Sequence, residues 1–96
     1  MPMVHKTTAF SQWIDGLRDV QGRGRIQARI ERLASGHPGD VKPVGHGVSE
    51  MRVDCGPGYR VYFTRQGPEI VILLAGGDKS TQAADIRYAL QLARNL

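Results

Sequence analysis

The sequence is poor in the residues that build covalent cross-links and metal sites. It has a single cysteine, Cys55, which excludes an internal disulfide. A cysteine-based zinc site is excluded for the same reason, and the histidines His5, His37 and His46 are too scattered to give the spacing of a metal site. We therefore expect neither a bound metal nor another cofactor.

Long hydrophobic runs are also missing. The longest, residues 70–75, suits a strand, whereas a membrane span needs about 20 apolar residues. The N-terminus lacks the apolar stretch of a signal peptide, so we expect a cytosolic protein with no membrane partner. The 96 residues are too few for two cores, and 41% of them are hydrophobic, which argues against disorder. We expect one folded domain over residues 1–96.

Acidic residues are outnumbered by basic ones. There are 13 Lys and Arg against 9 Asp and Glu, a net charge of +4, and 10 of the 13 are arginine. Arginine makes bidentate contacts to phosphate and carboxylate, so this bias suits a nucleic acid or an acidic protein partner. A solvated basic surface explains the same counts equally well.

Helical spacing of apolar residues marks the first part of the chain. It predicts one helix over residues 10–20 and a second over residues 25–35. Gly22 and Gly24 predict the connection between them, and Gly36 predicts the C-terminal cap of the second helix. The two helices are expected to form an antiparallel hairpin. Its expected exposed flank carries Arg25, Arg29 and Arg32.

The period changes to two in the second part of the chain. It predicts strands at residues 48–54, 59–65 and 69–75, separated by turns rich in glycine and proline. A last helix is predicted over residues 82–94, and a short strand over residues 3–8. The predicted fold is α+β, with a helix hairpin packed on an antiparallel sheet and a C-terminal helix.

Polar side chains on the two middle strands form a candidate site. Alternation places Arg52, Arg60 and Tyr62 opposite the apolar residues of the same strands. Glu50 and Arg52 share a face with Arg60 only in one register, which the sequence does not fix. Lys79 follows the next strand and could lean over this face.

Such a set fits metal-free cleavage of RNA. The 2′-hydroxyl must lose a proton and attack the adjacent phosphate, so a base and fixed cations are both needed. Glu50 is the expected base, Arg60 the phosphate clamp, and Lys79 a second clamp or the acid. Tyr62 is expected to stack on a nucleobase, as aromatic side chains do in single-stranded RNA recognition.

Simpler interpretations stay open for these residues. Arg60 and Glu50 can form only a cross-strand ion pair, worth about 0.2–1 kcal/mol. A tyrosine on a strand, such as Tyr62, more often packs than stacks. Lys42 is counted with Arg52 and Tyr62 among the expected RNA contacts, although it lies in a predicted loop where a lysine is commonly just solvated.

Several stretches carry a family likeness in chain order. They are the pattern Phe10, Trp13 and Leu17, and residues 39–44 (GDVKPV), 47–52 (GVSEMR), 58–63 (GYRVYF) and 73–82 (LLAGGDKSTQ). Together they resemble the RelE/ParE toxin superfamily, most closely its HigB-like branch of addiction module killer proteins. No single motif is specific, but the combination covers nearly the whole chain.

The resemblance implies a microbial RNase-like fold and a toxin of a type II toxin–antitoxin system. Most RelE-like and HigB-like members cut mRNA in the ribosomal A site, and a helix-turn-helix antitoxin from the same operon neutralises them. The ribosome, mRNA and such an antitoxin are therefore the expected partners.

By position, Arg60 matches the arginine of the family's G-Y-R strand. Lys79 falls near the basic residue after the next strand, and Arg52 matches a basic position in the preceding strand. Many RelE members have lysines where this chain has Glu50 and Arg52, whereas some relatives use a glutamate there as base. The catalytic tyrosine or histidine near the C-terminus of other members has no clear counterpart, and Tyr88 is a weak candidate.

Three functions follow from the sequence. The leading one is a ribosome-dependent mRNA endonuclease that blocks translation. A ParE-like protein that poisons DNA gyrase is the second, and it needs no catalytic residues. The third is a catalytically silent module that only binds its antitoxin.

Overall fold

A five-stranded sheet in the order β1-β5-β4-β3-β2 forms the centre of the computed structural model, which describes residues 3–96. The strands are β1 Met3–Lys6, β2 Val41–Gly45, β3 Val48–Val53, β4 Tyr59–Gln66 and β5 Ile70–Gly77. Strands β2 to β5 form an antiparallel meander. The expected antiparallel sheet is correct apart from β1, which pairs with β5 in parallel.

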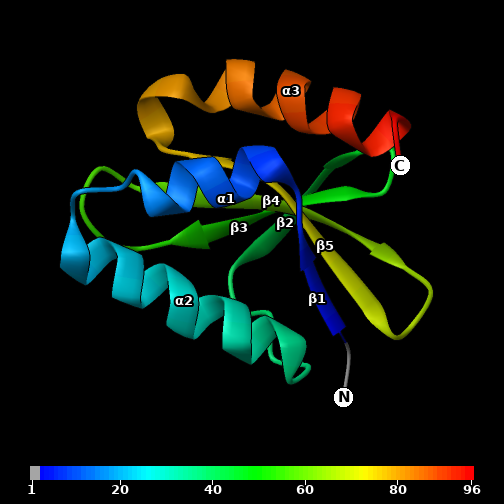
Figure 1. Ribbon diagram of the computed structural model, residues 1–96, viewed down its shortest axis with the longest axis horizontal. Coiled ribbons are helices and arrows are strands. Elements are labelled where there is room, and N and C mark those ends of the chain that lie inside the picture. Colours follow the sequence, from blue (N-terminus) through cyan, green and yellow to red (C-terminus); the bar gives the residue numbers. More distant parts are fainter. Residues whose placement is uncertain (1–2) are drawn as a thin grey trace.

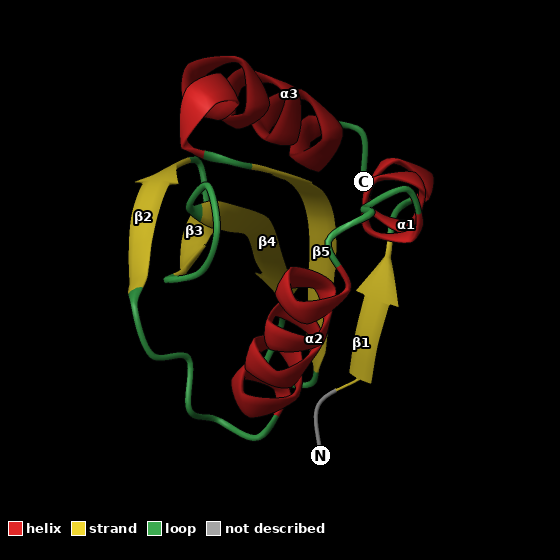
Figure 2. Ribbon diagram, turned by 90° about the vertical axis from the view of Figure 1, so that its left-hand side faces the viewer, coloured by secondary structure: helices red, strands yellow, loops and turns green. Residues whose placement is uncertain are grey.

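Helices cover both faces of this sheet (Figures 1 and 2). Helices α1 (Thr8–Asp15) and α2 (Val20–Ala34) bury apolar residues against one face, and α3 (Gln82–Arg94) covers part of the other. The predicted α+β class, with two N-terminal helices and a C-terminal helix, is therefore confirmed. Within residues 3–96, no helix is both long and apolar enough to cross a membrane.

The connection between α1 and α2 differs from the prediction. It spans residues 16–19, so Gly22 and Gly24 lie inside α2. Asp19 caps the helix, because its Oδ1 accepts a hydrogen bond from the backbone N–H of Gly22 at 3.0 Å. Gly22 is needed for packing: a Cβ there would lie 2.6 Å from Cε2 of Tyr59. A close approach, and not a helix end, explains this glycine.

A second difference is that residues 41–45 form strand β2 where a loop was expected. This strand contains Pro43, which is unusual because proline has no N–H for the hydrogen bonds between strands. β2 is an edge strand, so one side of it needs no partner. Lys42 is therefore a strand residue, paired in register with Glu50, and its side chain is exposed.

Gly76 of β5 is predicted to tolerate a side chain poorly, because a Cβ there would clash with a large ring. Trp13 of α1 lies on it, and a Cβ at Gly76 would be 2.1 Å from Cε3 of that ring. We expect Gly76→Ala to lower the free energy of unfolding by about 2 kcal/mol or more, measured by urea denaturation. Gly24→Ala is the control: no atom lies within 4 Å of that Cβ, so a gain of about 0.5–1 kcal/mol is expected in the helix. Equal changes in the free energy of unfolding for the two variants would contradict the close packing of Trp13 on Gly76.

Candidate active site

Four of the expected site residues lie together on the face of the sheet that α3 covers. The register places Glu50 opposite Tyr62 and Arg52 opposite Arg60, on the adjacent strands β3 and β4. This is the register that the sequence left open, and it brings both guanidinium groups next to the carboxylate.

Glu50 is the centre of this cluster and is 0% exposed. Its Oε1 accepts a hydrogen bond from Nε of Arg52 at 3.1 Å. Its Oε2 accepts hydrogen bonds from the hydroxyl of Tyr62 at 3.1 Å and from Nε2 of Gln82 at 2.8 Å. Nε of Arg60 lies 3.6 Å from the same oxygen. One buried carboxylate thus holds two cations and two neutral donors.

The environment keeps Glu50 ionised. Burial raises the pKa of its carboxyl group, but hydrogen bonds from Gln82, Arg52 and Tyr62 and the charge of Arg60 lower it more, so the pKa is below the ordinary value. Burial and the neighbouring Glu50 raise the pKa of Tyr62, so its hydroxyl stays protonated and donates. The negative charge of Glu50 offsets the repulsion between the two adjacent guanidiniums.

Tyr62 does not lie open for a nucleobase, so that expectation is wrong. Its ring is 0% exposed, in a cluster with Leu74 of β5 and Ala89 of α3. Strand alternation correctly placed Tyr62 and Val61 on opposite faces of the sheet. It did not show that α3 buries the part of the face where Tyr62 lies. The apolar stripe of the last helix was the available signal, since such a stripe must cover some surface.

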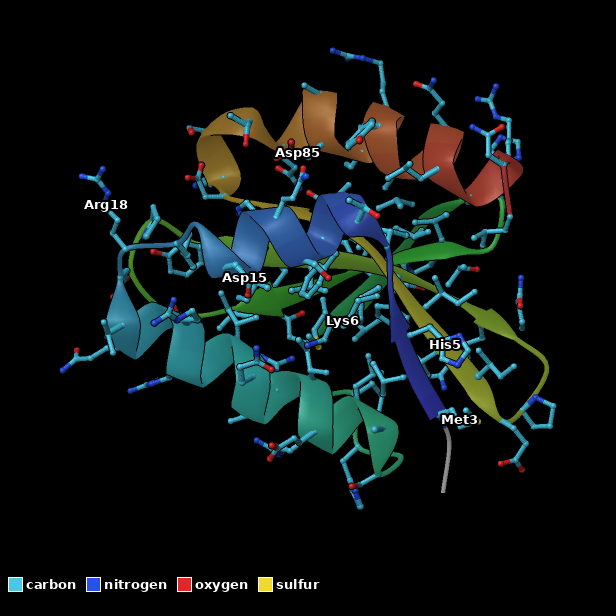
Figure 3. All side chains as sticks on the ribbon, in the orientation of Figure 1. Met3, His5, Lys6, Asp15, Arg18 and Asp85 are labelled. Carbon is cyan, nitrogen blue, oxygen red and sulfur yellow. The ribbon has the colours of Figure 1, made fainter. Side chains whose placement is uncertain are left out.

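The start of α3 is fixed over the cluster by two contacts. Gln82, which sequence reasoning missed, donates to Glu50 as described above. Asp85, labelled in Figure 3, accepts a hydrogen bond from Oγ1 of Thr81 at 2.5 Å and lies against β5, where a Cβ at Gly77 would be only 1.8 Å from its Oδ2. Gly77 pairs in register with Arg60, so this glycine lets α3 begin close to the site.

Arg52 and Arg60 also line a pocket of about 220 Å³. Its lining comprises the charged residues Asp40, Arg52, Asp54 and Arg60, together with Val53, Gly58 and Tyr59. The side chain of Arg52 is 38% exposed and that of Arg60 11%. Nη1 of Arg60 donates to the carbonyl oxygen of Gly58 at 2.8 Å, whereas its buried Nε has no hydrogen-bond partner within residues 3–96. Arg60 is therefore held in place from two sides.

Lys79 lies at the start of a short 3-10 helix, η1 (Lys79–Thr81), directly after β5, and its side chain is exposed. A Cβ at Gly58 would be 3.3 Å from Nη1 of Arg60 and 3.6 Å from Cβ of Lys79. Lys79 therefore lies next to the turn at Gly58, near Arg60, but it is not among the residues that line the pocket. Lys42 is exposed on β2 and is not among the residues that line the pocket.

Tyr59 is also among the lining residues, and its ring is fixed in the core between the sheet and helices α1 and α2. Its hydroxyl donates to Oδ2 of Asp19 at 2.8 Å, and Trp13 meets its ring edge-on at 6.3 Å. Burial and the neighbouring Asp19 raise the pKa of Tyr59 to about 12. The link joins the N-terminus of α2 to the first residue of β4, which nothing in the local sequence indicated.

Arg29 differs most from its expected role as a free cation on the flank of α2. Its Nη1 donates to the carbonyl oxygen of Arg52 at 2.6 Å, and its Nη2 to that of Pro38 at 3.0 Å. The backbone N–H of Arg52 in turn donates to the carbonyl oxygen of Asp40 at 2.9 Å. Arg29 therefore supports the rim of the pocket. Within residues 3–96, no group of three His, Cys, Asp or Glu side chains is placed to hold a metal ion.

Comparison with known proteins gives matches over nearly the whole chain. Residues 12–96 match the family described as "Phage derived protein Gp49-like (DUF891)". A protein of Haemophilus influenzae, described as uncharacterized, is 46% identical over 93 residues, which are 97% of this chain and 94% of that protein. A doubly arginine-substituted mutant of the E. coli toxin RelE in the free state matches with a TM-score of 0.73. That match covers 94% of this chain and 95% of the other, at 15% identity, and shows a common fold.

Proposed function

Because the chain belongs to the phage-derived Gp49-like family and has the fold of RelE, we propose that it is the toxin of a type II toxin–antitoxin system. We propose further that it cleaves mRNA on the ribosome and so blocks translation. One observation carries the second step. Arg52 and Arg60 are held side by side by a buried carboxylate and line a pocket, and the exposed Lys79 lies next to the turn at Gly58.

In the proposed reaction, the 2′-hydroxyl of a ribose attacks the adjacent phosphate and gives up its proton. The bond to the 5′-oxygen breaks, that oxygen takes up a proton, and a 2′,3′-cyclic phosphate remains. Negative charge grows on the phosphate oxygens along this path. Fixed cations aimed at such charge lower the barrier most when they need no rearrangement during the reaction. Arg60 is the phosphate clamp, with Arg52 beside it and Lys79 above the turn.

Glu50 has a different part in this proposal from the one its sequence position indicated. A general base must come within about 2.6–3.2 Å of the proton it removes. The carboxylate of Glu50 is 0% exposed, so it would reach RNA only if the cluster opened. We assign it the positioning of both arginines, and we place the catalytic contribution of this chain in its cations.

Induced expression in growing cells tests the proposed function. Protein synthesis, followed by incorporation of labelled methionine, is expected to stop while DNA stays intact and transcripts are shortened. DNA damage with intact transcripts would favour the gyrase poison instead. Normal growth of cells that express the chain without any antitoxin would favour the third function, a catalytically silent module that only binds its antitoxin.

The proposed partner is a helix-turn-helix antitoxin whose acidic residues meet the basic surface of this chain. The structure separates two arginines that the sequence grouped together on α2. Arg25 is exposed, whereas Arg29 is bound to the two backbone carbonyls described above. Arg32 is exposed as well, so Arg25 and Arg32 are the residues of this helix flank that can contact a partner.

Charge reversal distinguishes these roles. We expect Arg25→Glu to weaken antitoxin binding about two- to tenfold and to leave the melting temperature unchanged, since its charge is at the surface. Arg29→Glu is expected to lower the free energy of unfolding by about 1.5–3 kcal/mol, because charged hydrogen bonds to backbone are lost. Calorimetric titration and thermal unfolding give the two readouts. Unchanged affinity in Arg25→Glu would move the docking surface away from α2.

A further inference from the structure

Arg60 carries a buried donor, its Nε, that makes no hydrogen bond with any of residues 3–96. This nitrogen lies 3.6 Å from Oε2 of Glu50, which is too far for a hydrogen bond. Buried donors are nearly always paired, and leaving one unpaired is unfavourable. Because a carboxylate lies directly in front of this donor, the missing bond needs a physical cause.

The cause lies in the oxygen that the donor faces. A carboxylate oxygen offers about two acceptor sites. On Oε2 of Glu50, the hydroxyl of Tyr62 takes one site at 3.1 Å, and Nε2 of Gln82 takes the other at 2.8 Å. Two neutral donors therefore fill this oxygen, although a guanidinium makes a stronger hydrogen bond to a carboxylate than either of them does.

The two neutral donors reach the oxygen from different elements. Tyr62 belongs to β4, as Arg60 does, and its ring is buried in the core that α3 covers. Gln82 is the first residue of α3 and is 32 residues away from Glu50 along the sequence. Its contact with Glu50 is shorter than those made by the two arginines and the tyrosine. Helix α3 thus supplies the donor that completes the occupation of Oε2.

An arginine that closes on a carboxylate has fewer donors left for a phosphate. A guanidinium has five N–H groups in a planar fork, and a bidentate pair with a carboxylate takes two parallel ones. In Arg60, Nη1 already donates to the carbonyl oxygen of Gly58. Closure of Nε onto Glu50, which is 0% exposed, would also draw the guanidinium toward the interior. In the open arrangement, Glu50 attracts the positive charge but does not occupy the fork.

We propose that Gln82 is a positioning residue for the cleavage: it fills the acceptor site on Glu50 that Arg60 would otherwise take, and so keeps the guanidinium open for the phosphate of RNA. The inference rests on the proposed function, which supplies that phosphate. It goes further because it gives the first residue of α3 a part in the reaction without contact with the substrate. It also predicts a loss of activity without a loss of stability.

The side-chain Nε–Hε signal of Arg60 in the NMR spectrum tests this proposal in the whole chain, without ribosomes. Gln82→Met keeps the length of the side chain and removes its N–H groups. The freed oxygen should then accept a hydrogen bond from Nε, so the proton signal is expected to move downfield and to exchange more slowly with water. Tyr62→Phe frees the same oxygen from β4 and should move the signal in the same direction. The signal is assigned by its absence in Arg60→Lys.

Cleavage on programmed ribosomes gives the second readout. We expect Gln82→Met to cleave about 10- to 100-fold more slowly, because a small displacement of a group that must meet the phosphate is enough for such a loss. Its midpoint of urea denaturation should not fall, since a hydrogen bond from a guanidinium replaces the one from an amide. Gln91→Met is the matched control, because Gln91 lies on the same helix and is exposed. It should change neither the signal nor the rate.

Titration with inorganic phosphate, followed through the same signal, separates this proposal from the proposed function. A downfield signal and weaker phosphate binding in Gln82→Met, from a natural chain that cuts no mRNA, would keep the role of Gln82 at an anion site and overturn the function. An Arg60 signal that does not move in Gln82→Met would overturn the proposal and leave the function standing if the natural chain cleaves mRNA. Cleavage by Gln82→Met at the natural rate would overturn the proposal as well. A slower rate with a lower denaturation midpoint and an unmoved signal would show that Gln82 only stabilises the fold.

Discussion

Arg60→Ala is expected to abolish growth inhibition and to lower the rate of mRNA cleavage by about 10²–10³-fold, which is the usual cost of removing one fixed donor from a developing oxyanion. The expectation follows from how firmly the side chain is held. Its Nε faces the buried Glu50, and its Nη1 is hydrogen-bonded to Gly58, so neither alanine nor water reproduces a donor in that place. The cleavage rate on programmed ribosomes is the measurement.

Arg65→Ala is the matched control, because Arg65 lies on the same strand β4 but is exposed near its other end. It should cleave at the natural rate. Arg60→Lys should recover only part of the activity, since lysine keeps the charge but lacks the planar fork of donors. Binding of the antitoxin by Arg60→Ala shows that the variant is folded. Full toxicity of that variant would remove Arg60 from the site.

Glu50→Gln is expected to have the largest effect on stability, lowering the free energy of unfolding by about 3 kcal/mol at pH 7. Glutamine keeps the size of the side chain but removes the charge that faces two guanidiniums. Arg60, which is 11% exposed and has no hydrogen bond at Nε, is then a nearly buried cation without its counter-charge. Urea denaturation of both proteins measures the difference.

The effect of this substitution should depend on pH with a defined sign. The pKa of Glu50 is lower in the folded chain than in the unfolded one, so the unfolded state binds the proton first as pH falls. The stabilisation that Glu50 provides is fully present above pH 4.5, the ordinary value for a glutamate, and is lost as pH falls below it through the folded pKa. The difference in the free energy of unfolding between the natural chain and Glu50→Gln should therefore become smaller as pH falls below 4.5.

Asp19 and Asp78 also have lowered pKa values, through hydrogen bonds at Gly22 and Tyr59 and at Ser80 respectively. For this reason the difference between the two proteins is the informative quantity. Glu69 is an exposed carboxylate in a turn, and Glu69→Gln should not show the loss of stability at pH 7. If the difference in the free energy of unfolding between the natural chain and Glu50→Gln stays constant from pH 7 to pH 3, the ionised state of Glu50 is contradicted.

The sequence was sufficient to predict the kinds and order of most elements, because their apolar periods are clean. The strand at 48–54 and the last helix at 82–94 agree with β3 and α3 within a residue. The prediction failed where a residue that often interrupts a helix or a strand lies inside one. Gly22 was taken for a break between two helices but permits contact with Tyr59, and Lys42, beside Pro43, was placed in a loop but lies in the edge strand β2.

The candidate site was predicted in part. Alternation placed Arg52, Arg60 and Tyr62 on one face. The register that brings them to Glu50 depends on how β3 and β4 pair, and the sequence of either strand alone does not determine that pairing. The burial of Tyr62 depends on where α3 lies. Gln82, Arg29 and Tyr59 were missed because their partners are 32, 23 and 40 residues away along the sequence.

The most direct test of the central claim is the integrity of a defined mRNA incubated with the purified chain, with and without programmed ribosomes, read by mapping new 5′ ends. The proposed function predicts cuts that appear only with ribosomes and disappear with Arg60→Ala. Intact mRNA in every reaction, from a chain that still arrests growth, would contradict it.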